Sequence, residues 1–285
     1  MQNYYLLIST GLLIGSFIPF ALIFEKRKPR ARELVLIAVM SAITVVANLI
    51  CAYTVPFHAG TAVVIITGIA LGPEAGFLTG ALARLLCNFF MGQGIWTPWE
   101  MVAWAILGGL AGVMFNKAVI SKWLEDQKLQ KKERVYEGLT AVLPAFFCIV
   151  VSEVIAYLVY LFTRQQEEPF FGWRVYLFGL IGVVTALFFQ KKKLPVDAIT
   201  MSVFTFFSVF ILYGGLMNMA SFFMTNAIAE SQAGTGLDAI KLLYITGAPY
   251  DAWHALGASI CVFLFGDNMV QKLERIKIKY GMYHK

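Results

Sequence analysis

Residues 68–90 read GIALGPEAGFLTGALARLLCNFF, and this stretch decides the fold of the chain. Small residues spaced four apart let helix backbones approach closely, which is how helices associate where lipid and protein are equally apolar. The Gly72-Pro73-Glu74 break predicts a tight turn between two short apolar helices, 58–72 and 75–90. The glycines that recur every fourth residue are Gly68, Gly72, Gly76 and Gly80.

The composition of the whole chain favours a membrane protein. Of its 285 residues 59% are hydrophobic and only 14% are charged, whereas about a quarter of the residues in a soluble domain are charged. The four cysteines lie in apolar segments and form no CxxC pair, so neither a zinc site nor a disulfide framework is expected. The chain has no GxxxxGK[ST] motif and therefore no P-loop of its own. We expect an all-α, polytopic transmembrane helical bundle.

The number of spans follows from the apolar runs. A helix needs about 20 apolar residues to cross the hydrocarbon layer, with about 17 as a lower limit. Nine runs approach or exceed that length, so the sequence predicts nine spans: 4–24, 33–54, 58–72, 75–90, 99–115, 139–163, 173–190, 195–217 and 245–266.

The distribution of basic residues supports this count. With the N-terminus outside the cell, nine spans place 19 of the 23 Lys and Arg residues on the cytoplasmic side, as the positive-inside rule requires. Counting 58–72 and 75–90 as one helix would scatter the basic loops over both sides. We therefore expect a multi-pass protein of the cell membrane, with an outside N-terminus and a cytoplasmic C-terminus.

This topology divides the chain into five parts. They are an extra N-terminal transmembrane helix with a basic linker (1–32), the first four core helices (33–115), a basic cytoplasmic loop (116–138), the remaining transmembrane helices (139–266) and a basic cytoplasmic tail (267–285).

Polar residues from distant parts of the chain fall in the outer third of the predicted bundle. Strongly polar side chains within a bilayer are costly and usually mark a cavity or a pathway. Their mixture of aromatic, amide and carboxylate groups suits a pocket for a flat ring with polar edges. The alternative is that Trp, Tyr and polar residues simply gather at the membrane interface. The predicted substrate-binding residues are Asn48, Asn88, Gln93, Trp96, Glu100, Asn218, Tyr250, Asp251 and His254.

No catalytic residues are expected. Asp251 and His254 are three apart and share a helix face, but a catalytic pair also needs a nucleophile, and Ser259 points elsewhere. Arg84 and Glu153 both fall in mid-membrane, where an ion pair between them is plausible.

Ala31–Phe115 resembles the substrate-binding (S) component of energy-coupling factor (ECF) vitamin importers. It contains ARELVLIAVMSAITVVAN, the glycine-rich hairpin, a loop with GQGIWTPW and a following GLAG helix. The closing segment YDAWHALGASICVFLFGDNMVQKLERIK is similar to the last helix and basic tail of a longer S-component subgroup. The usual S component has six spans, so the resemblance implies that helix 4–24 and one later hairpin are additions.

The resemblance implies a high-affinity binding subunit without ATPase activity. Such a subunit joins a transmembrane scaffold (T) subunit and two cytoplasmic ATPases, whose ATP-driven movement topples it and carries its pocket from outside to inside. The family's AxxxA docking motif matches Ala38 and Ala42. The chain itself would bind no cofactor, because ATP is used by the partners. The nickel and cobalt members have a histidine directly after Met1, where this chain has Gln2, so a vitamin or vitamin precursor is expected, and the residues do not choose among vitamins.

Other functions remain open from the sequence. The main alternative is a stand-alone secondary transporter or channel for a small organic solute, which would need polar residues in the inner half of the bundle as well. Arg84 and Glu153 are the main polar residues outside the outer third. An intramembrane enzyme or a membrane scaffold are further alternatives.

Overall fold

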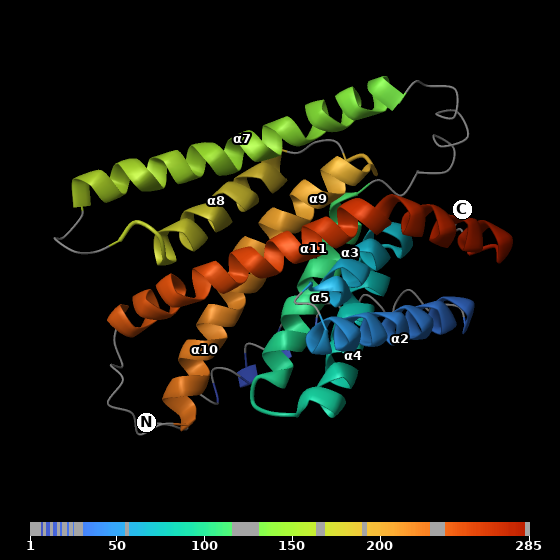
Figure 1. Ribbon diagram of the computed structural model, residues 1–285, viewed down its shortest axis with the longest axis horizontal. Coiled ribbons are helices and arrows are strands. Elements are labelled where there is room, and N and C mark those ends of the chain that lie inside the picture. Colours follow the sequence, from blue (N-terminus) through green and yellow to red (C-terminus); the bar gives the residue numbers. More distant parts are fainter. Residues whose placement is uncertain are drawn as a thin grey trace.

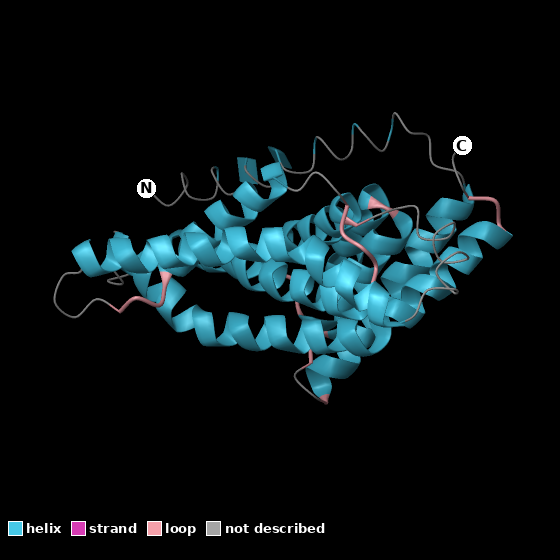
Figure 2. Cartoon of the chain, turned by 90° about the horizontal axis from the view of Figure 1, so that it is seen from above, coloured by secondary structure: helices cyan, strands magenta, loops and turns pink. Residues whose placement is uncertain are grey.

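The structure, a computed structural model, describes residues 31–54, 57–115, 131–163, 169–189, 193–228 and 237–282, with a few isolated positions in the first 30. Within these ranges the chain is mainly helical, with loops between the helices (Figure 2). The one extended pairing among the described residues is an isolated bridge between Phe115 and Leu194. The helices are α2 (Ala31–Tyr53), α3 (Ala59–Leu71), α4 (Pro73–Met91), α5 (Thr97–Met114), α7 (Lys131–Thr163), α8 (Trp173–Phe189), α9 (Ala198–Phe207), the π-helix η1 (Ser208–Gly214), α10 (Gly215–Ile228) and α11 (Leu237–Lys279).

The all-α prediction is confirmed for the described residues. Three helical stretches are long and apolar enough to cross a bilayer, judged by length and composition: Ala31–Tyr53, Val142–Thr163 and Ala198–Thr225. Ala59–Leu71 and Trp173–Phe189 are shorter apolar helices. Eight of the nine predicted spans coincide with helices. The predicted span 195–217 corresponds to α9, η1 and the start of α10, which together form one continuous rod. The ninth, 4–24, lies mostly outside the described residues, so the count of nine stays a prediction.

Several predicted boundaries differ from the structure. Most of segment 1–32 and residues 116–130 of the basic loop lie outside the described residues, and the rest of that loop is already helical because α7 begins at Lys131. The predicted tail from residue 267 begins within α11, which continues to Lys279. The division of the chain into five parts stays a prediction. Hydropathy marks the apolar part of each helix, while backbone hydrogen bonding extends the helix into its charged flanks.

The break after Leu71 is the turn that the sequence predicts. Gly72 has a φ of 102°, a left-handed conformation that favours glycine, and Pro73 then begins α4. The Glu74 carboxylate falls in the first turn of α4, where it complements the positive end of the helix dipole.

Glycines bring α3, α4 and α5 into backbone contact. A Cβ atom built on Gly68, Gly76 or Gly108 would overlap backbone atoms of the neighbouring helix. One built on Gly112 would overlap Gly72 and Pro73 in the turn. The expected role of these glycines in close packing is therefore confirmed, and the three helices form the most tightly joined part of the molecule.

Among the described residues, six helical rods form the core, and α7 and α8 form a side arm. In Figure 1, α7 and α8 lie together along one edge, with α9 and α11 between them and the layer of α2 to α5. Helices α7 and α8 pack chiefly on each other and contact the rest of the bundle through α9, η1 and α11. The remaining rods are α2, α3, α4, α5, α9–η1–α10 and α11. The hairpin outside the six-rod core is thus α7–α8.

Candidate functional site

A cavity of about 380 Å³ lies among α2, α4, α5, η1 and α11, at the end of the bundle that holds the α4–α5 link. Its size falls within the range of small-molecule pockets, about 300–1,000 Å³. We call it the polar pocket. Its lining residues are Asn48, Cys51, Ala52, Tyr53, Thr54, Phe57, His58, Arg84, Met91, Glu100, Trp104, Tyr213, Tyr250, Trp253 and His254.

The polar pocket has a buried floor and an aromatic rim. Trp104 and His254 on the floor are each 2% exposed. The rim residues Tyr53, Tyr250 and Trp253 are all more than half exposed. A ligand could therefore be covered on its inner side while aromatic faces remain available at the opening.

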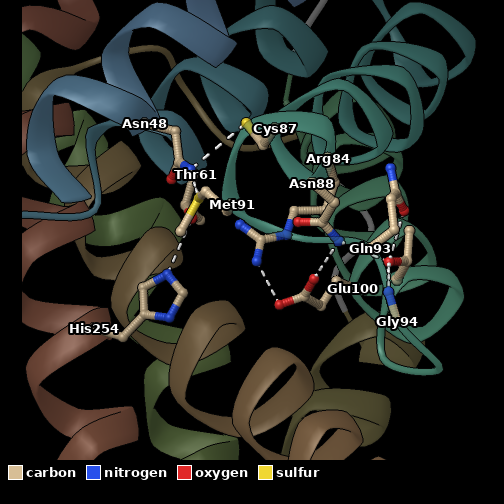
Figure 3. A network of polar contacts seen from close by, with 11 residues as sticks. Asn48, Thr61, Arg84, Cys87, Asn88, Met91, Gln93, Gly94, Glu100 and His254 are labelled. Atoms are coloured by element: carbon tan, nitrogen blue, oxygen red, sulfur yellow. Dashed lines mark hydrogen bonds and ion pairs between the residues drawn. The ribbon is translucent and has the colours of Figure 1, made fainter. Parts of the chain in front are cut away.

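An ion pair joins α4 to α5 in the pocket wall. Arg84 donates to one oxygen of Glu100, and Asn88 donates to the other at 2.8 Å (Figure 3). The Arg84 guanidinium lies 5.2 Å from the centre of the Trp104 ring, close enough for a cation–π contact. Both charged side chains are only 12% exposed. Because each charge is balanced by the other, the pair places a fixed dipole in the wall without leaving a bare charge in the membrane.

The sequence suggested an ion pair between Arg84 and Glu153, and this prediction is wrong, because Arg84 pairs with Glu100. Glu153 belongs to α7, and its carboxylate lies against Gly179 of α8 in the side arm. The partner of Arg84, Glu100, lies in the first turn of the adjacent helix α5.

A second group of contacts fixes the link between α4 and α5. Asn88 donates to the Thr97 hydroxyl at 3.0 Å, and that hydroxyl donates to Gln93 at 2.9 Å. The backbone N–H of Gly94 also donates to Thr97, at 3.2 Å. Asn88 and Gln93 thus hold the link in place behind the pocket rather than lining it.

Two histidines stack at the pocket floor. The ring centres of His58 and His254 lie 3.8 Å apart with the planes inclined by 29°, and Tyr213 meets His254 edge-on at 4.5 Å. Nε2 of His254 is 2.9 Å from the Thr61 hydroxyl, which leaves Nδ1 without a hydrogen-bond partner.

The polar pocket gathers unpartnered buried polar atoms. Among the described residues seven buried side-chain nitrogen or oxygen atoms lack a partner, and three of them belong to residues of the pocket: Arg84 Nε, Trp104 Nε1 and His254 Nδ1. A buried donor without an acceptor costs about 1–3 kcal/mol. The side-chain amide of Asn48 is only weakly hydrogen-bonded. Its Nδ2 donates to the sulfur atoms of Cys87 and Met91 at 3.5 Å, and sulfur is a weak acceptor. Arg84 and Trp104 thus bring two buried donors without acceptors to the pocket wall, whereas His254 Nδ1 donates or accepts according to the tautomer of the ring.

Asp251 and Asn218 do not line the polar pocket. Asp251 Oδ2 accepts from the Tyr176 hydroxyl of α8 and from Asn218 at 2.7 Å. Although Asp251 and His254 share a face of α11, they contact different helices: Asp251 bonds to α8 and α10, whereas His254 bonds to Thr61 of α3. The Asp251 cluster ties α10, α11 and the side arm together.

The nine predicted site residues thus fall into four groups. Asn48, Glu100, Tyr250 and His254 line the polar pocket, whereas Asn88 and Gln93 support it. Asn218 and Asp251 form the separate cluster, and Trp96 is 41% exposed just before α5 without lining the pocket.

Sequence reasoning missed Arg84, Trp104 and His58 as pocket residues. One signal was present for the first two: Arg84 precedes Asn88 by four residues, and Trp104 follows Glu100 by four, so each pair shares a helix face. His58 lies before α3, and its contact with His254 depends on the tertiary fold.

The fold defines a polytopic helical membrane protein with a pocket of small-molecule size at one end of its bundle. A family model described as ECF-type riboflavin transporter, S component, matches residues 28–177, just over half of the chain. The chain belongs to this family, which confirms the resemblance found in Ala31–Phe115. Comparisons with curated proteins and with solved structures found no match.

Family membership makes the chain a non-catalytic, multi-pass membrane subunit of a vitamin transport system. Residues 28–177 include α2 to α5 and α7, so the match covers the glycine-rich hairpin and the α4–α5 link. The similarity of the closing segment to the last helix of a longer subgroup lies outside the matched residues and stays a prediction.

We predict that the Arg84–Glu100 pair holds the pocket wall together. Glu100→Ala leaves a buried guanidinium without its counter-charge and should lower the free energy of unfolding by about 3–5 kcal/mol. The double variant Arg84→Met/Glu100→Leu should be more stable than the Glu100→Ala variant, because it removes both charges. Unfolding in mixed detergent micelles measures this difference.

The matched control is Asp238→Ala, since Asp238 is 98% exposed and 3.5 Å from Lys241. A pair so exposed contributes about 1 kcal/mol or less. Equal stability of the Glu100→Ala and Asp238→Ala variants would show that the buried pair is not a structural constraint.

Proposed function

We propose that this chain is the substrate-binding subunit of an ECF-type importer, and that the polar pocket captures a vitamin or vitamin precursor from outside the cell. The observation that carries this proposal is the gathering of Arg84 Nε, Trp104 Nε1 and His254 Nδ1, all buried and unpartnered, around one pocket. Family membership supplies the transport context.

The chemistry of the pocket favours a flat, uncharged ring with acceptor atoms on its edge. Trp104 Nε1 and Arg84 Nε are donors by nature, so they fit carbonyl oxygens or ring nitrogens. The charge of Arg84 is balanced by Glu100, so the wall has no excess cation for an anionic ligand. Tyr250 and Trp253 at the rim provide aromatic faces. The description of the matching family makes riboflavin the first ligand to test.

The proposed orientation places the pocket at the outer face. Among the described residues, Lys193 before α9 and Lys277 and Lys279 in the last turn of α11 are basic residues predicted for the cytoplasm, and they lie at the opposite end of the helices. By the positive-inside rule this end would face the cytoplasm. With the first helix included, the N-terminus would then lie outside.

The proposed partners are a transmembrane scaffold subunit and two cytoplasmic ATPases, and ATP would be bound by those partners rather than by this chain. The proposed docking surface is the stripe of Ala38 and Ala42 on α2. Both alanines are exposed, while Ile37, Met40 and Ser41 between and beside them face the core. An exposed small-residue stripe permits close approach of a partner helix, and toppling of the subunit against that partner would carry the pocket inward.

Trp104→Phe should weaken riboflavin binding about tenfold while keeping the ring that packs on the floor. One hydrogen bond from a buried donor contributes about 1 kcal/mol or slightly more, and 1.4 kcal/mol corresponds to a factor of ten. Titration of the purified subunit, followed by flavin fluorescence, gives the Kd.

Trp99→Phe is the matched control, because Trp99 is buried on the same helix and stacks on Phe223 away from the pocket. Equal affinities of the two variants would remove Trp104 from the site. Absence of riboflavin binding by the unaltered protein would reject riboflavin itself and move the search to other vitamins.

Ala42→Leu should abolish uptake in cells while leaving ligand binding to the isolated subunit intact. The added side chain blocks close approach at the stripe but lies on the outside of α2, away from the pocket. Uptake of labelled vitamin and Kd of the isolated subunit are measured in parallel.

Ile43→Phe adds bulk to the next residue of the same helix, about 100° around its axis, at a position that is also exposed. This control should keep uptake. Lost uptake in both variants, or lost binding in Ala42→Leu, would argue against a specific docking stripe.

A further inference from the structure

A second cavity of about 480 Å³ lies between α8 and the helices α5, η1, α10 and α11. The π-helix η1 separates it from the polar pocket: Tyr213 lines the polar pocket, whereas Ile211 and Leu212 line the second cavity. We call it the lateral cavity. Further apolar lining residues include Ile106, Leu177, Leu180, Leu216, Met219 and Ile240.

The lateral cavity has one unsatisfied polar group among its three polar side chains. The Tyr176 hydroxyl donates to Asp251, and the Tyr244 hydroxyl donates to the Gly215 carbonyl at 3.0 Å. Trp173 Nε1 is buried and has no hydrogen-bond partner. An occupant of this cavity should therefore be apolar along most of its length and carry one acceptor at the Trp173 end.

The lateral cavity borders the membrane. Leu177 and Leu180 are 44% and 43% exposed on α8, so the cavity lies next to a lipid-facing surface. Water has few partners in so apolar a space, and apolar cavities of about 150 Å³ stay dry and take up apolar ligands instead. The nearest abundant apolar chains in a bilayer are those of its lipids.

The dimensions of the cavity suit one acyl chain. From Trp173 to Leu180 the helix rises about 10 Å, and one leaflet of the hydrocarbon core is about 15 Å deep. Trp173 begins α8, and tryptophan is enriched at the membrane interface, where ester groups of lipids lie.

We propose that the lateral cavity binds one acyl chain of a membrane phospholipid, and that the ester carbonyl of that chain accepts a hydrogen bond from Trp173 Nε1. The bound chain packs on Ile211 and Leu212 from the membrane side. It thereby supports the same π-helical turn that carries Tyr213 against His254 in the polar pocket.

Leu180→Trp tests the proposal by filling the mouth of the cavity, with Ile181→Trp as the matched control. Ile181 is the next residue on α8 and is 47% exposed, but it does not line the cavity. The delipidated full chain is titrated with palmitoyl-oleoyl-phosphatidylcholine, and bound lipid is counted by native mass spectrometry. We expect one retained lipid in the unaltered protein and in Ile181→Trp, and at least tenfold weaker retention in Leu180→Trp.

Trp173→Phe provides a second, milder test in case Leu180→Trp does not fold. Loss of one hydrogen bond should weaken retention roughly fivefold. Equal retention in all variants, equal loss in Leu180→Trp and Ile181→Trp, or no retained lipid in the unaltered protein would overturn the proposal. Displacement of the lipid by riboflavin would also overturn it, because the cavity would then belong to the substrate site.

Discussion

The backbone contact of α4 with α5 at Gly76 and Gly108 is the constraint on which the rest of the structure depends. It brings the two helices so close that Arg84 on α4 reaches Glu100 and the ring of Trp104 on α5. A charged pair inside a membrane bundle is tolerable only when each partner is satisfied, because a bare charge in an apolar medium costs several kcal/mol. The glycines therefore make the polar pocket possible, although none of the glycines in this contact lines it.

The π-helix η1 gives the two sides of the same rod different surroundings. A π-turn adds a residue to the helical repeat and often occurs at functional sites. In η1 it places Tyr213 on the polar pocket while Ile211 and Leu212 face the lateral cavity. The Tyr176–Asp251–Asn218 cluster then anchors the side arm beside this turn. The proposed vitamin site and the proposed lipid site are thus separated by a single helical turn, and each provides packing for it.

Much of the fold could be predicted from the sequence because hydropathy and glycine spacing are local signals. The Gly72-Pro73 turn and the close packing at Gly68, Gly76 and Gly108 follow from residues near one another in the chain. Helix ends were harder to predict, because charged flanks such as 131–138 continue a helix that hydropathy no longer marks.

The candidate site could be predicted only in part. His254 and Asn48 stood out as polar residues in apolar segments, and both line the pocket. Asp251 stood out for the same reason but hydrogen-bonds Tyr176, a residue 75 positions away. The depth of a residue in the membrane was readable from the sequence, whereas the helices that Asp251 and His254 each contact are set by tertiary packing.

The most direct test of the account is mass spectrometry of small molecules released from the detergent-solubilised protein after expression without partners. We expect one vitamin or vitamin precursor per chain, with a flat ring and acceptor atoms on its edge. A protein that releases no such molecule, and that is not stabilised against heat by any vitamin in a thermal-shift screen, would contradict the assignment of the polar pocket as a substrate site.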